Sequence, residues 1–144
     1  MSWWLSDEEE KIKRQRKERE EREKQLSKKV NLAMQEHDRL VRDLLTDAGE
    51  LLLGSNNYRV ECEPPGPAKY FCYWHLYENS KLVDSLSTLK VKLIVTDNNR
   101  KRRNCFQVTS RLVGGNYTHQ TENCSRAELQ RCIKLAVNDI IDWY

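Results

Sequence analysis

The chain has 144 residues, the length of one domain, and its formal net charge is only +3 although 33% of its residues are charged. So small a net charge does not by itself indicate a nucleic-acid-binding protein. The sequence also lacks the run of roughly 18 apolar residues that a membrane-spanning helix needs. Acidic residues directly follow the first apolar residues, a pattern that fits neither a secretory signal nor a transit peptide. We therefore expect a cytoplasmic protein that is not bound to a membrane.

The opening segment predicts a helix that is stable without a partner. Ser6 and Glu9 form a capping box, and oppositely charged residues then recur four positions apart over residues 7–24. Each such pair stabilises a helix by about 0.2–0.5 kcal/mol, so the segment needs no apolar face. Ile12 is almost the only apolar residue in it. We predict that residues 1–25 form a charged, solvated helical extension.

The next segment predicts a helix that packs on a core. From Leu26 to Ala48, apolar residues recur at steps of three and four, and Gly54 is the predicted stop. One continuous helix from about residue 7 to Leu53 would be about 70 Å long, at a rise of 1.5 Å per residue. Its charged half would then project beyond the core. The alternative is that the chain folds back at Gln25–Lys28.

The middle of the chain predicts strands. The segments with strand character are residues 57–63, 69–77, 88–96 and 105–113, and residues 116–123 predict a weak fifth strand or a loop. The sequence PPGPA between the first two segments predicts a hairpin, and the polar turn DNNRKRRN separates the next two. Ser125 and Glu128 then form a second capping box, followed by a helix that turns its apolar residues inward, Ile141 among them.

The order of these elements predicts the fold class. No strand–helix–strand unit is present, so the sheet is expected to be a meander of sequential antiparallel strands. The predicted class is α+β: a long N-terminal helix, an antiparallel four- to five-stranded meander sheet and a C-terminal helix packed on one face, in two layers. Residues 26–144 form a single α+β domain in this prediction, with Trp74 and Trp143 buried.

The alternation of the strands also predicts which side chains point away from the helices. Leu89, Val91 and Leu93 must face the helices, which turns the lysines between them outward. On the preceding strand we place the more polar of the two alternating sets outward. The predicted outward-facing residues are Phe71, Tyr73, His75, Tyr77, Lys90, Lys92 and Arg111, bordered by the basic turn Arg100, Lys101, Arg102 and Arg103. Single-stranded nucleic acid is bound by such aromatic and basic residues, but Glu61 and Glu63 on the edge strand would repel phosphates.

The sequence contains no pattern that indicates a metal site, a cofactor or a catalytic centre. Cys72 and His75 have a metal-like spacing, but residues three apart on a strand point to opposite faces and cannot share an ion. The five cysteines are an odd number without a framework spacing, which predicts reduced thiols. His37 lies on the apolar stripe of the first helix, and we interpret its neighbour Asp38 as an acid that faces water. We predict a protein that is not an enzyme and has neither metal nor cofactor.

The tryptophans at the start of the chain suggest a function. Leu5 precedes the first cap, but the position that would pack against it is Glu10, so the helix offers no local hydrophobic partner. Tryptophan is the residue type most enriched at binding hot spots. We interpret Trp3, Trp4 and Leu5 as the partner-binding residues of a small non-enzymatic adaptor, a subunit or inhibitor of a larger assembly with a protein partner. One alternative is that the extension folds back and caps the core. The other is a nucleic-acid-binding module that uses the outward-facing sheet residues and the basic turn.

Overall fold

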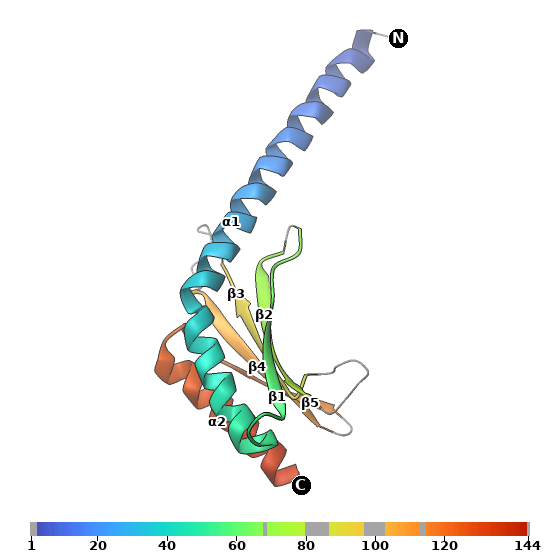
Figure 1. The fold of residues 1–144 in the computed structure, drawn as a ribbon. Helices are drawn as coiled ribbons and strands as arrows, with labels where there is room; N and C mark the ends of the chain where they lie inside the picture. The colour runs from blue at the N-terminus through green and yellow to red at the C-terminus, as the bar shows by residue number, and fades with distance from the viewer. Residues whose placement is uncertain (1–2, 68, 80–86, 97–102, 113–114, 144) are drawn as a thin grey trace.

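The fold consists of two helices and one five-stranded sheet (Figure 1). The computed structural model describes residues 3–67, 69–79, 87–96, 103–112 and 115–143, with side chains from residue 5 onward. Its elements are α1 (Trp3–Leu53), β1 (Tyr58–Glu63), β2 (Phe71–Glu78), β3 (Leu89–Ile94), β4 (Cys105–Leu112), β5 (Gly115–Gln120) and α2 (Arg126–Trp143). The predicted α+β class is confirmed, and the weak fifth segment is a strand.

Helix α1 is continuous and does not fold back at Gln25–Lys28 (Figure 1). The predicted start after Ser6 is wrong, because α1 begins at Trp3 and Ser6 lies inside the helix. Trp3, Trp4 and Leu5 are compatible with helical backbone, so the helix includes them. At the other end, α1 stops before Gly54, whose φ of +84° is a left-handed conformation that glycine adopts without strain. Within the described residues, neither helix is both long and apolar enough to cross a bilayer.

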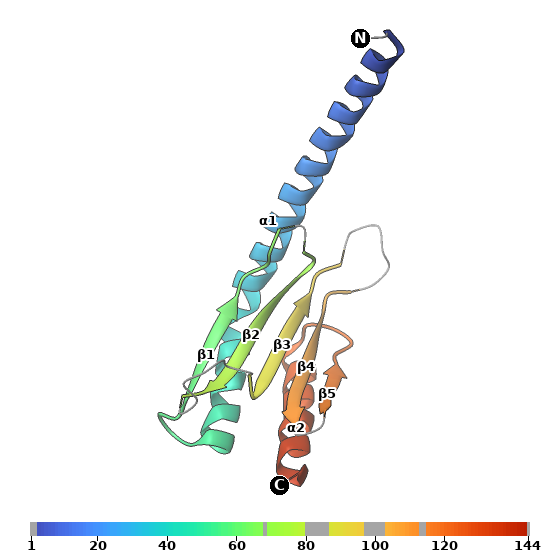
Figure 2. The same cartoon turned by 90° about the vertical axis from the view of Figure 1, so that its right-hand side faces the viewer.

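The sheet is a meander in which the strands follow the order β1-β2-β3-β4-β5 and every neighbouring pair is antiparallel (Figure 2). Val91 in β3 lies opposite Trp74 in β2 and opposite Val108 in β4. These three side chains face the helices and are fully buried, as the alternation predicted. The residues between them in the strands are mostly half-buried, and no described helix lies over that outer face (Figure 2).

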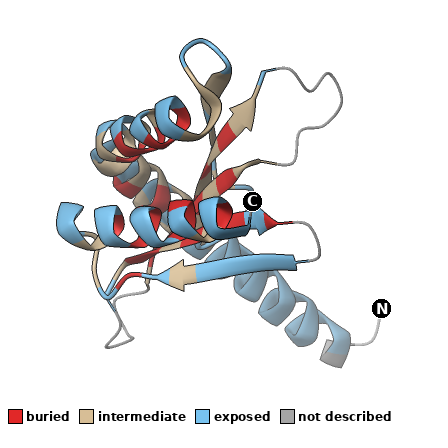
Figure 3. Cartoon of the chain, turned by 90° about the horizontal axis from the view of Figure 1, so that it is seen from below, coloured by how far each residue is buried: buried red, intermediate tan, exposed pale blue. Residues whose placement is uncertain are grey.

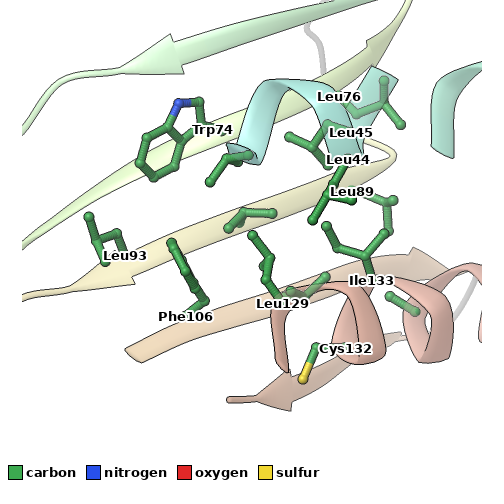
Figure 4. Packing of buried hydrophobic residues seen from close by; sticks show 14 of the residues in the cluster. Leu44, Leu45, Trp74, Leu76, Leu89, Leu93, Phe106, Leu129, Cys132 and Ile133 are labelled. Carbon is green, nitrogen blue, oxygen red and sulfur yellow. The ribbon is translucent and has the colours of Figure 1, made fainter. Parts of the chain in front are cut away.

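The core lies between the inner face of the sheet, the second half of α1 and one side of α2 (Figure 4). Apolar residues recur along both helices at the helical period, which is why one stripe of each is buried. Gly49 lets α1 approach β1 closely, since a Cβ atom there would lie 2.7 Å from the ring of Tyr58. His37 packs edge-on against Phe106, with ring centroids 5.4 Å apart, so this histidine belongs to the helix–sheet interface.

Helix α2 begins after Ser125 as predicted, but only half of the predicted capping box forms, and the helix also ends differently. The N–H of Glu128 donates to Ser125 Oγ at 3.3 Å, whereas the carboxylate of Glu128 accepts from the N–H of Glu122 at 3.3 Å. The expectation that Ile141 and Trp143 are buried is wrong, because their side chains are 49% and 52% exposed. Ile140 is the last buried residue of α2, and beyond it the end of the helix extends past the sheet, so Ile141 and Trp143 have no core to cover (Figure 2).

Candidate functional site

The first half of α1 forms an exposed rod. Every residue from 5 to 22 is exposed, and the helix projects past the sheet without touching it (Figure 1). Leu5 and Ile12 are 37% and 46% exposed, so the two apolar side chains described in this segment lie in solvent. Trp3 and Trp4 belong to α1, but their side chains lie outside the described part of the structure.

The outer face of the sheet carries a line of four rings on β2, which we call the aromatic column: Phe71, Tyr73, His75 and Tyr77. Alternate residues of a strand share one face, so each ring lies next to the following one. The ring centroids of successive residues are 5.3, 5.9 and 5.3 Å apart. The last two rings, His75 and Tyr77, are stacked with an interplanar angle of 16°. The column is therefore a contiguous aromatic strip, and it confirms the predicted orientation of β2.

Cations from both neighbouring strands lie over this strip. Lys92 Nζ is 4.1 Å from the centroid of Phe71, and Lys90 Nζ is 5.1 Å from that of Tyr73. On the other side, Arg59 Cζ is 4.7 Å from the centroid of Tyr77. A cation within about 6 Å of a ring face is attracted by the ring quadrupole. These contacts occupy ring surface that an incoming base would need for stacking.

Two acids on β1 border the column. His75 Nε2 lies 3.2 Å from a carboxylate oxygen of Glu63, and Arg59 Nε donates to Glu61 Oε1 at 3.0 Å. His75 Nδ1 is buried and has no hydrogen-bond partner among the described residues. The β1 side of the face is thus negatively charged at two positions.

The same acids act on the phenols of the column. Burial raises the pKa of the Tyr73 hydroxyl above its ordinary value, and the nearby charge of Glu63 adds to the effect. Burial also raises the pKa of Tyr77, with further contributions from Glu61 and Glu63 that Arg59 partly offsets. Both hydroxyls therefore remain protonated at neutral pH, and neither is an activated nucleophile or base.

The structure brings together some of the predicted nucleic-acid-binding residues. The column and the two lysines meet on adjacent strands, while Arg111 lies on β4, level with Tyr77 but two strands away. Arg103 is exposed just before β4. Arg100, Lys101 and Arg102 lie outside the described residues. Arg59 was missed by the sequence reasoning, although the alternation of β1 places it on the outer face together with the two acids.

One polar contact inside the fold was also missed. Trp74 Nε1 donates to Asp38 Oδ1 at 2.9 Å, and Arg42 Nε donates to both oxygens of that carboxylate at 2.9 and 3.0 Å. Our interpretation of Asp38 as an acid that simply faces water is therefore wrong. A buried indole N–H needs an acceptor, and α1 places this carboxylate within reach of it. The sequence signal that could have predicted this hydrogen bond was a tryptophan in a core strand together with an acidic residue on the helix that covers it.

The cysteines provide neither an activated thiol nor a metal site within the described residues. Desolvation by burial raises the pKa of Cys72 to about 12, and the same cause raises that of Cys124 to about 12. These thiols are protonated at neutral pH and are poor nucleophiles. Cys72 is buried on the inner face while His75 lies on the outer face, as the spacing predicted. No group of three or more potential ligands that could hold a metal ion occurs within the described residues.

Comparison of the chain with protein-family models, with curated proteins and with solved structures finds no match. The exposed half of α1 and the outer face of the sheet are therefore the two surfaces from which a function can be proposed.

Proposed function

We propose that this chain is a small non-enzymatic binding protein that docks a protein partner through Trp3, Trp4 and Leu5 at the tip of α1. The observation that supports the proposal is the exposed, projecting first half of that helix. A segment of this kind contributes no buried area to the fold, so its stability comes from its own charge pairs. It is instead suited to hold its first residues away from the domain.

The length of the rod gives the proposal a geometric basis. The 20 residues between the tip and the first core-facing positions of α1 span about 30 Å, at 1.5 Å per residue. An apolar tip at that distance can enter a pocket on a partner without a clash between the partner and the sheet. The charged sides of the rod match the polar rim of a typical interface, and the tryptophans match its apolar centre.

Deleting residues 1–25 should separate binding from folding. We expect the melting temperature to fall by less than about 4 °C, which corresponds to about 1 kcal/mol in a domain of this size. Partner binding should be lost. The melting temperature is measured by circular dichroism, and binding by capture from native lysate with and without nuclease. A drop of many degrees would show that the segment stabilises the core, which would remove the basis of the proposal.

A nucleic-acid-binding module is the second candidate, and the observation that favours it is the aromatic column with its flanking lysines. Two observations weigh against it: cations already lie over the rings, and Glu61 and Glu63 border them. We therefore rank it below the protein-binding proposal.

Charge removal at the basic turn tests this second candidate. The quadruple change of Arg100, Lys101, Arg102 and Arg103 to serine should weaken binding to single-stranded DNA or RNA. It should also lower the slope of the logarithm of the binding constant against the logarithm of the salt concentration by about 0.7 for each lost phosphate contact. Replacing Lys11, Lys13, Arg14 and Arg16 by serine is the control, since it removes the same charge from the rod.

Tyr73→Ala and Tyr77→Ala test base stacking. Each should lower the binding free energy by roughly 1–3 kcal/mol if bases stack on these rings. If the unmodified chain retains no oligonucleotide at low salt, this candidate is excluded.

A further inference from the structure

The two edges of the sheet differ in how their backbone groups are satisfied. At the β1 edge, Arg42 Nη1 donates to the carbonyl of Val60 at 3.3 Å, and Asn79 Nδ2 donates to the carbonyl of Tyr58 at 3.1 Å. β1 also carries three charged side chains and is followed by two prolines. Charges, prolines and covering side chains are the features that prevent an edge strand from pairing with another chain.

The β5 edge has none of these features among the residues that the structure describes. Its sequence GNYTHQ contains no Lys, Arg, Asp, Glu or Pro, and five of its six residues are exposed. The strand lies at the side of the sheet next to α2, away from α1 (Figure 3). Among the described residues only β4 pairs with it. An uncharged, exposed edge strand of this kind is a template for strand addition.

The register shows which backbone groups of β5 point outward. The N–H of Thr121 donates to the carbonyl of Phe106, which makes this a hydrogen-bonded pair of the antiparallel ladder. Such pairs alternate with non-bonded ones. Residues 107 and 120, 109 and 118, and 111 and 116 are therefore the non-bonded pairs. It follows that Asn116, Thr118 and Gln120 direct their N–H and C=O groups away from β4, to the free edge.

We infer that the β5 edge pairs with the β5 edge of a second copy of this chain, antiparallel and about a twofold axis at Thr118. This register places Thr118 opposite Thr118 of the second copy, and Asn116 of each copy opposite Gln120 of the other. Every residue whose backbone groups point to the free edge then pairs with a residue of the same kind. Each such pair exchanges two N–H···O=C bonds. No like charges face each other along the strand, because β5 has no charged residue. The same operation at β1 would meet the charged side chains and the two carbonyls that are already bonded.

Exposed apolar side chains beside β5 fit the same partner. Tyr117 in β5 is 53% exposed on the helix side of the strand, and Leu135 and Trp143 in α2 are 37% and 52% exposed. β5 and α2 run in opposite directions (Figures 2 and 3). His119 Nε2 in β5 lies 2.6 Å from Asp139 Oδ2 in α2, so these two residues are at the same position along the strand direction.

Leu135 and Trp143 lie one turn before and one turn after Asp139, on the same side of the helix. A twofold axis near Thr118 therefore brings Leu135 of one copy towards Trp143 of the other. It also brings the two Asp139 carboxylates closer together, and each of them keeps its contact with the His119 of its own copy. The five-stranded sheets would join into one continuous sheet, with the two α1 rods projecting from opposite ends.

Proline at position 118 tests the pairing directly. Thr118→Pro removes an N–H that points away from β4, and proline is tolerated on an edge strand in that orientation. Thr118→Val keeps the N–H and the shape and is the matched control. Light scattering of the full chain should give twice the 17.1 kDa of one chain for the unmodified protein and for Thr118→Val. It should give the mass of one chain for Thr118→Pro.

Three further variants make the result decisive. Thr118→Lys sets two lysines opposite each other at the twofold axis, so this variant should also be monomeric. Trp143→Ser removes an apolar contact between the two copies, so it should raise the dissociation constant of the dimer. Circular dichroism confirms that each variant is folded. The paired change of Trp3 and Trp4 to alanine should leave the dimer intact, which separates this inference from the proposed function of the tip. A monomeric unmodified chain, or a folded Thr118→Pro or Thr118→Lys chain that remains dimeric, would overturn the inference.

Discussion

Replacing Trp74 by alanine should lower the free energy of unfolding by about 3–5 kcal/mol, the range found when a large buried aromatic side chain is truncated. Trp74 is fully buried on the inner face of β2, where it packs against residues of β3 and α1 (Figure 4). The change also removes the donor to Asp38. Urea unfolding followed by circular dichroism gives the value, and a loss of less than about 1 kcal/mol would contradict the described core.

Two variants separate the sources of this effect. Trp74→Phe keeps most of the apolar volume but removes the N–H, so it should cost less than the alanine variant, about 1–3 kcal/mol. Tyr70→Ala truncates an aromatic residue next to β2 that is 52% exposed, and it should change stability by no more than about 0.5 kcal/mol. If both aromatic truncations to alanine had similar effects, burial could not be the cause.

Changing Trp3 and Trp4 together to alanine should lower the affinity for the partner by at least ~2 kcal/mol, which is roughly 30-fold. Each tryptophan buries about 150–250 Å² when it docks, and it loses little conformational freedom in doing so. The unfolding free energy should stay the same, because the first half of α1 is exposed throughout residues 5–22. Titration calorimetry with the captured partner measures the change.

The control for this variant lies on the same rod. Ile12 is an exposed apolar side chain two to three turns from the tip, and Ile12→Ala should leave the affinity within about 0.5 kcal/mol of the original. Equal losses for Ile12→Ala and the tip variant would indicate that the whole rod is the contact, and that the tryptophans are not a separate anchor.

The fold could be predicted largely because its local patterns agree with one another. Strict alternation in β3, and the alternation of β4 from Phe106 onward, showed which face is buried, and the absence of a crossover helix left an antiparallel meander. The orientation of β2 followed from the polarity of its two faces, with Trp74 inward and Tyr73 outward. Patterns of period two depend only on the strand itself, so they do not require knowledge of its neighbours.

The errors occurred where tertiary context decides. Asp38 is bound by a tryptophan 36 positions away, and no local pattern encodes that distance. Trp143 has the helical spacing of a core residue, but the sheet ends before α2 does. The register at Thr118, which determines what the β5 edge presents, also becomes visible only once β4 is in place.

The most direct measurement of the central claim is the fluorescence of the tip. Subtracting the emission spectrum of the Trp3→Phe, Trp4→Phe variant from that of the unmodified chain isolates these two indoles. It leaves the core untouched, with Trp74 bound to Asp38 and Trp143 in place in both proteins. In the isolated chain the difference spectrum should show the red-shifted emission of indole in water and be quenched by acrylamide. It should shift to the blue and resist quenching only when the partner is added. A blue-shifted, protected difference spectrum in the isolated chain would contradict the claim, because it would place both tryptophans against the chain's own surface.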